Sequence, residues 1–187
     1  MAAEADLLLL LAPQITDERQ LYAIDQFLMQ GGTVIAASSP FNARFVGNSL
    51  QLQRYDSGLA DWLAHHGLRI EEQLVMDSQS SAFPLPVTRD VGGFQVQEVY
   101  MQDYPYFIDV RGRGLNVDNG ITADLPQVSL AWASPITTQE TTVQDRSLTD
   151  LLLSSKGSWL SDSLDVTPRI DALAAHAVAP AGETRSY

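Results

Sequence analysis

The clearest pattern of apolar and polar positions lies near the start of the chain. An unbroken apolar run at 7–11 is typical of a strand that is buried on both faces. Apolar residues then recur at helical spacing over 21–28, after an N-cap candidate at Thr16 and before a glycine stop at 31–32. The β-branched segment 33–37 follows. This order predicts a right-handed βαβ crossover whose two strands are parallel neighbours.

The pattern is weaker along the rest of the chain. Residues 41–55 have mixed character and predict a long loop with one short strand. Residues 57–67 predict a second helix with a glycine stop, and strand segments follow at 68–70 and 74–77. The serine- and proline-rich segment 78–86 predicts a linker or surface loop. Four more segments predict strands: 93–101, 104–110, 128–132 and 147–154.

These elements define an α/β chain, and 187 residues suit one domain with a sizeable core. We therefore expect a single α/β domain over 1–187, with a β-rich excursion over 78–135 and a frayed tail over 171–187. Hydrophobic residues make up 45% of the chain and charged residues 18%, which is the composition of a globular protein. Because the chain starts almost directly on a strand, we expect it to be a piece of a longer protein.

Charge and cysteine content exclude several classes of function. The formal net charge of −12 argues against a nucleic-acid or anionic-membrane surface, because phosphate groups would be repelled. The absence of cysteine excludes disulfide bonds, thiolate zinc sites and a cysteine nucleophile. No apolar run approaches the roughly 20 residues that span a bilayer.

The sequence shows no pattern for a metal or a cofactor. His65 and His66 are adjacent on the predicted helix, so their side chains point about 100° apart and cannot chelate one metal as an i, i+4 pair could. We expect both to be solvent-exposed at a helix C-terminus. The glycine-rich segment 111–114 lacks the spacing of a phosphate-binding loop. We therefore predict no metal site and no cofactor.

Two adjacent serines, Ser38 and Ser39, end the second predicted strand. Open α/β sheets bind their ligands at the carboxyl ends of parallel strands, so this position is a candidate ligand site. The surrounding sequence lacks the glycine elbow and the histidine partner of a serine hydrolase. The residues that we expect to line such a site are Pro13, Gln14, Ser38, Ser39, Phe41 and Asp77.

Aromatic residues cluster between positions 100 and 107. Tyrosine side chains provide rigid, amphipathic contact area, so this cluster is a candidate protein interface. It fits the edge of a hydrophobic core equally well, and the sequence leaves both interpretations open. The residues concerned are Tyr100, Tyr104, Tyr106 and Phe107.

Four segments, in this order and spacing, resemble a known family. They are the helix and strand at 22–41, the helix–glycine–strand unit at 58–77, the segment 119–135 that ends in Trp-Ala-Ser-Pro, and LLLSSKGSWL at 151–160. Together they are similar to the extracytoplasmic auxiliary component of ABC transporters associated with gliding motility. The resemblance covers roughly residues 6–170. It implies an α/β fold of the flavodoxin-like or class I glutamine-amidotransferase-like type: a three-layer sandwich with a mostly parallel sheet, some antiparallel additions and no catalytic cysteine.

The same resemblance implies partners and a location. Family members work beside an ABC permease and an ATPase, at the extracytoplasmic (periplasmic) face of the inner membrane, and are anchored by transmembrane helices that this chain lacks. No catalytic residues are carried over from the family. The sequence therefore predicts a non-catalytic auxiliary module that acts through protein or ligand contacts.

Two alternatives remain open at this point. The first is a hydrolase-like enzyme on a small or sugar substrate, with its site near Ser38. The second is a structural spacer whose contact face is the aromatic stretch at 100–107.

Overall fold

The computed structural model describes residues 5–138, 147–168 and 184–187. The chain divides into two compact units, which are treated separately below. The first unit comprises Met1–Ala43, Leu52–Glu72 and Ile136–Leu148. The second comprises Arg44–Gln51, Gln73–Pro135 and Thr149–Tyr187.

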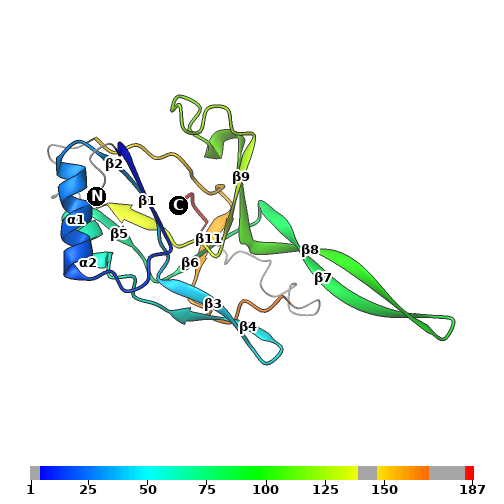
Figure 1. Ribbon diagram of the computed structural model, residues 1–187. Coiled ribbons are helices and arrows are strands. Elements are labelled where there is room, and N and C mark those ends of the chain that lie inside the picture. The colour runs from blue at the N-terminus through cyan, green and yellow to red at the C-terminus, as the bar shows by residue number, and fades with distance from the viewer. Residues whose placement is uncertain (1–4, 139–146, 169–183) are drawn as a thin grey trace. The chain divides into compact units, whose positions relative to one another are not determined.

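The first unit begins with the predicted βαβ crossover (Figure 1). Strand β1 (Leu7–Leu11) pairs in parallel with β2 (Thr33–Ala37), and helix α1 (Glu18–Met29) connects them. This prediction is confirmed. The helix starts one residue later than expected, because Asp17 rather than Thr16 is the N-cap. Its carboxylate accepts the backbone N–H of Gln20 at 2.8 Å, and the Gln20 side chain accepts the N–H of Asp17 in return.

Helix α1 covers only one face of the β1–β2 pair. Ile24 and Phe27 are its buried residues, and a Cβ on Gly32 would lie 2.4 Å from the Phe27 ring, so only glycine fits where β2 begins. The alternate positions of both strands are exposed to 46–66%: Leu7, Leu9, Leu11 and Ile35. The prediction that the run at 7–11 is buried on both faces is therefore wrong for the described residues.

The remaining elements of the first unit are short. Helix α2 (Ala60–His65) precedes strand β5 (Leu68–Ile70), as predicted, and β5 pairs antiparallel with β10 (Ile136–Thr138). Strands β3 (Phe41–Val46) and β4 (Ser49–Arg54) form a hairpin, where a long loop was expected. The base of this hairpin belongs to the first unit, and its turn belongs to the second.

The second unit consists of antiparallel strands. Strand β8 (Phe94–Arg111) lies between β7 (Ser80–Val91) and β9 (Gln127–Ala131) in a three-stranded sheet. Strands β6 (Leu74–Asp77) and β11 (Ser158–Ser161) form a separate pair. A short 3-10 helix, η1 (Gly112–Gly114), follows β8. The core contains these buried residues: Val75, Ile108, Val110 and Leu115.

Two predictions for this unit are wrong. The segment 78–86 was expected to be a linker, but its residues from 80 onward form the first half of β7. No regular strand forms at 147–154, where one isolated bridge joins Leu152 to Leu115, and the next regular strand is β11. The tail predicted to be frayed lies outside the described residues up to position 183. Its last residues are hydrogen-bonded: Arg185 donates its N–H to the carbonyl of Ser158 at 3.0 Å.

The predicted fold class is also wrong. Strands account for 46% of the described residues and helices for 13%. Parallel pairing is confined, in that part of the chain, to β1 and β2, and the other strands form small antiparallel sheets. The chain is therefore not a flavodoxin-like or amidotransferase-like sandwich with a mostly parallel sheet. A single βαβ unit is compatible with many architectures, and here the sheet stops at its second strand.

Candidate functional site

The predicted ligand site lies where β1 and β2 end. Ala12 extends the parallel pairing by donating its N–H to the carbonyl of Ala37 at 2.8 Å. The two serines after β2 make local contacts: Ser38 donates its hydroxyl to the Ser57 hydroxyl at 3.2 Å, and Ser39 accepts the N–H of Phe41 at 3.1 Å. The serines are therefore held by hydrogen bonds from the chain itself.

The segment 55–58 closes this end of the strand pair. The hydroxyl of Tyr55 donates to the carbonyl of Pro13 at 2.7 Å, and the N–H of Thr16 donates to the carbonyl of Ser57 at 2.9 Å. Gly58 has φ of +75°, and a Cβ at this position would lie 2.5 Å from the carbonyl oxygen of Thr16. The loop after β1 and the segment 55–58 therefore approach so closely that glycine is required.

This arrangement offers no activated nucleophile. The group that Ser38 contacts is a neutral hydroxyl, which cannot act as a general base at neutral pH. Among the residues that the structure describes, no cluster of three or more histidine, aspartate or glutamate side chains could hold a metal ion. The geometry at Ser38 therefore suits binding or structural support better than hydrolysis.

The six predicted lining residues divide between the two units. Pro13, Gln14, Ser38, Ser39 and Phe41 belong to the first unit, where Gln14 is exposed and Phe41 is buried. Asp77 belongs to the second unit.

Asp77 ends strand β6 and is fully buried. One carboxylate oxygen accepts the N–H of Gln79 at 2.8 Å and the hydroxyl of Ser155 at 2.5 Å. The other oxygen accepts the N–H of Ser155 at 2.6 Å. The carboxylate therefore joins the end of β6 to the loop before β11, and both of its oxygens have partners.

The four aromatic residues at 100–107 occupy different environments. Tyr104 and Tyr106 are buried, Phe107 is half-buried and Tyr100 is 50% exposed. The ring centroids of Tyr104 and Phe107 lie 4.9 Å apart in an edge-to-face arrangement, and Trp132 extends this cluster. Most of the stretch is therefore in the core of the second unit, and only Tyr100 presents a largely open side chain.

The buried tyrosines are held by polar contacts as well. The hydroxyl of Tyr104 donates to the carbonyl of Val166 and accepts the indole N–H of Trp132 at 3.2 Å. Burial raises the pKa of Tyr104 well above its ordinary value, although the hydrogen bond from Trp132 opposes this shift. Burial raises the pKa of Tyr106 in the same direction.

His66 is not solvent-exposed as predicted. Its side chain is only 15% exposed, and its Nε2 atom lies 3.4 Å from the Asp25 carboxylate on α1. The indole N–H of Trp62 donates to the same carboxylate at 3.3 Å. These contacts connect the end of α2 to α1 within the first unit. His66 therefore has a structural role.

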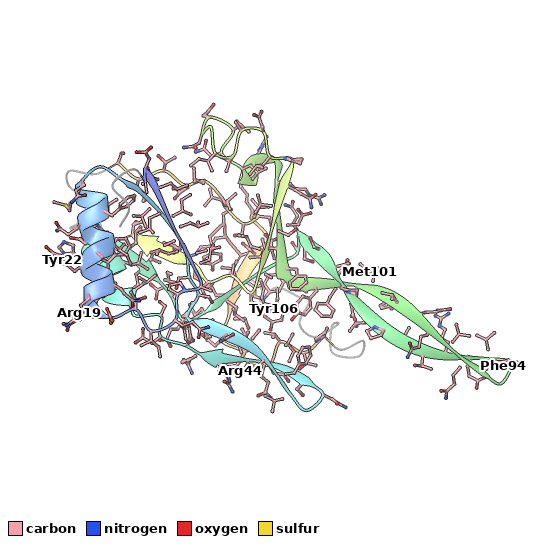
Figure 2. All side chains as sticks on the ribbon, viewed as in Figure 1. Arg19, Tyr22, Arg44, Phe94, Met101 and Tyr106 are labelled. Atoms are coloured by element: carbon pink, nitrogen blue, oxygen red, sulfur yellow. The ribbon has the colours of Figure 1, made fainter. Side chains whose placement is uncertain are left out.

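The sequence did not predict two groups of exposed apolar side chains. One is the bare face of β1–β2, formed by Leu7, Leu9, Leu11 and Ile35. The other is the β7–β8 hairpin beyond residue 84, which we call the arm. Phe94 marks its tip and Met101 lies further along it (Figure 2). An unbroken leucine run cannot indicate which face is covered. Alternation over 93–101 predicted a strand with one buried face, but residues 94–101 are exposed on both faces.

The fold and these surfaces define a protein that offers apolar contact surfaces and, among its described residues, no assembled catalytic centre. A family model described as an ABC-type uncharacterized transport system matches residues 1–178, so the chain belongs to this family. No curated protein and no solved structure matches the chain.

Membership in this family makes the chain an auxiliary component of an ABC transport system, with a membrane-associated role. In the parts of the chain that the structure describes, no helix is long and apolar enough to cross a bilayer.

Proposed function

We propose that this chain is a non-catalytic docking module that binds other subunits of its ABC transport system through the bare face of β1–β2. Four large aliphatic side chains of this face are each about half exposed in a unit whose other face is covered by α1. Contiguous exposed apolar patches on soluble proteins commonly mark interaction sites. This face is the single observation that carries the proposal.

The shape of the face favours a protein partner over a small ligand. Leu9 and Ile35 are opposite each other in the parallel register, and Leu7 and Leu11 lie on either side along β1. The resulting surface is an aliphatic ridge on a pleated sheet, with Thr33, opposite Leu7, as the one polar side chain among its paired positions; small-ligand sites are instead concave and bring several polar groups together. A sheet face or a helix of another subunit can cover such a ridge.

The proposal includes finer points that rest on the family resemblance. The partners are the permease and the ATPase of the system, the module lies on the extracytoplasmic side of the inner membrane, and transmembrane helices outside this sequence anchor it. The resemblance to gliding-motility transporters makes movement-related transport the corresponding role.

The test is co-purification of the full-length protein from its own cells in mild detergent. Leu9→Asp places a charge at the centre of the face, and we expect it to remove the permease and ATPase from the purified complex. Tyr22→Asp is the matched control, because Tyr22 is 66% exposed on the outer side of α1 in the same unit (Figure 2). Retention of both subunits by Leu9→Asp, or their absence with the unmodified protein, would refute the proposal.

A further inference from the structure

The arm presents one strand edge that can pair with another strand and one edge that cannot. Its two strands are closed by a two-residue turn, Gly92–Gly93, in which both residues have positive φ. In such a hairpin Val91 and Phe94 form a hydrogen-bonded pair. From there, non-hydrogen-bonded and hydrogen-bonded pairs alternate along the two strands. Pro84 and Pro86 therefore fall at non-hydrogen-bonded positions, opposite Met101 and Val99.

This register determines what each outer edge offers. At non-hydrogen-bonded positions the backbone groups point away from the partner strand. The outer edge of β7 lacks two N–H donors there, because residues 84 and 86 are prolines. The outer edge of β8 keeps an N–H and a carbonyl at Gln95, Gln97, Val99 and Met101. Within the described residues, β9 pairs with this edge only at Phe107–Arg111.

The side chains of the arm are apolar as well. Six of them are exposed to between 41% and 77%: Val91, Phe94, Val96, Val99, Tyr100 and Met101. Pairing at the β8 edge would bring the β8 members of this group into cross-strand contact with the partner strand, in addition to the backbone hydrogen bonds.

Charge favours contact at the arm over contact elsewhere between two copies. The whole chain carries −12, but residues 84–101 contain only Arg89, Asp90 and Glu98. Arg89 and Glu98 already pair across the hairpin at 3.5 Å. The eight residues from 84 to 91 extend about 25 Å, which exceeds the Debye length of about 8 Å at physiological salt. Two acidic bodies can therefore remain screened from each other while their arms touch.

We propose that two copies of this chain associate by antiparallel pairing of their β8 edges, with the two-fold axis at Gln97. This register places Phe94 of each copy opposite Tyr100 of the other, an aromatic pair of the kind that stabilises cross-strand contacts. It also keeps Glu98 opposite Val96. A register centred one residue further would oppose two Glu98 carboxylates. The dimer is a property of the arm and does not depend on the docking function of the β1–β2 face.

A cysteine cross-link tests this geometry directly, because the chain contains no cysteine. Gln97→Cys places two thiols at the axis, where strand pairing sets their Cα atoms about 5.5 Å apart, within disulfide range. Thr88→Cys is the matched control, because Thr88 lies directly opposite Gln97 on the proline-blocked edge. On mild oxidation we expect a covalent dimer from Gln97→Cys and monomer from Thr88→Cys. Equal cross-linking of both variants, or of neither, would overturn the proposal.

Sedimentation of the cysteine-free chain supplies the second measurement. We expect a reversible dimer whose dissociation constant rises about tenfold or more in Gln97→Pro and changes little in Thr88→Pro. Circular dichroism checks that both variants keep their strands, and the cross-linking result stands if Gln97→Pro does not fold. A chain that stays monomeric, or a dimer that both prolines leave intact, would overturn the proposal.

Discussion

Replacing Asp77 with asparagine should lower the free energy of unfolding by about 3 kcal/mol. The carboxylate is fully buried and accepts three hydrogen bonds, from Gln79 N–H, Ser155 N–H and the Ser155 hydroxyl. Asparagine keeps the shape of the side chain but offers only one acceptor oxygen. Its best orientation retains the two bonds at one oxygen and turns the amide NH₂ toward the N–H of Ser155.

The magnitude follows from this single mismatch. A hydrogen bond to a charged group contributes about 1.5–3 kcal/mol, and a buried donor without a partner costs about 1–3 kcal/mol. Ser155→Ala is the graded comparison. It removes one donor to Asp77 and the acceptor for Gly157 N–H, and should cost about 1–2 kcal/mol.

Urea unfolding measured by tryptophan fluorescence is the appropriate assay. Trp159 is buried on β11, opposite Met76, the residue before Asp77, so its emission reports on this region. The slope of the transition should stay constant while the midpoint shifts. Asp90→Asn is the control at an exposed turn, where a change within about 0.5 kcal/mol is expected.

Two results would refute the structural role of Asp77. An Asp77→Asn change within 0.5 kcal/mol would mean that the three hydrogen bonds contribute little. An increase in stability would indicate that Asp77 is kept at a cost to folding, as ligand-binding residues often are. The second result would support the original prediction that Asp77 lines a ligand site.

Two further predictions concern tyrosine burial and backbone conformation. Because burial raises the pKa of Tyr104 and Tyr106 above their ordinary value of 10.0, the unfolded chain loses these protons first. The stabilisation that comes from these two protonated tyrosines should therefore be fully present below about pH 10 and should be lost as the pH rises above it. Tyr104→Phe should make the urea midpoint less dependent on pH above about 10. An unchanged pH dependence in Tyr104→Phe would contradict the raised pKa of Tyr104. Gly58→Ala should cost about 2–4 kcal/mol in urea unfolding, because it combines a positive φ with a clash against Thr16, whereas Gly47→Ala, with φ of +61° and open space, should cost about 1 kcal/mol. Equal losses would show that the contact with Thr16 is unimportant.

The sequence predicted the elements that depend on local patterns. The strand at 7–11, the helix after it and the returning strand at 33–37 follow from apolar spacing, a cap and two glycines. The strand at 93–101 follows from alternation, but the buried face that the alternation predicted is wrong, because residues 94–101 are exposed on both faces. Each of these signals is contained in a short window, so no knowledge of distant partners is needed.

Pairing partners depend on distant residues, and there the predictions failed. Strand β6 pairs with β11, which lies about 80 positions later in the chain. The hydrophobic run of β6 would look the same if it paired with β1 instead, so the sequence of β6 does not identify its partner strand. The prolines of β7 suggested a linker, yet both occupy outward-facing edge positions that a strand tolerates. A mostly parallel sheet was expected because the family resemblance implied it, whereas among the described residues the parallel pairing is limited to β1 and β2.

The candidate site shows the same division between local and distant information. The sequence placed Ser38 and Ser39 at the end of a parallel strand, and the structure has them there. It gave no sign that Ser57, 19 residues later, would meet Ser38, or that Asp77 would be surrounded by donors from the loop at 155. Leucines 7, 9 and 11 were expected inside because a continuous apolar run has no polar side to mark solvent.

The two proposed surfaces belong to different units and can be tested against each other in one experiment. Leu9→Asp should remove the transport subunits and leave the Gln97→Cys cross-link intact. Gln97→Pro should weaken the dimer and leave co-purification intact. If either substitution abolishes both properties while the chain stays folded, the two surfaces act as one, and a dimer would then be a condition for docking. If each affects only its own property, an acidic chain of net charge −12 has two separate apolar contacts: one for its transport system and one for its own copy.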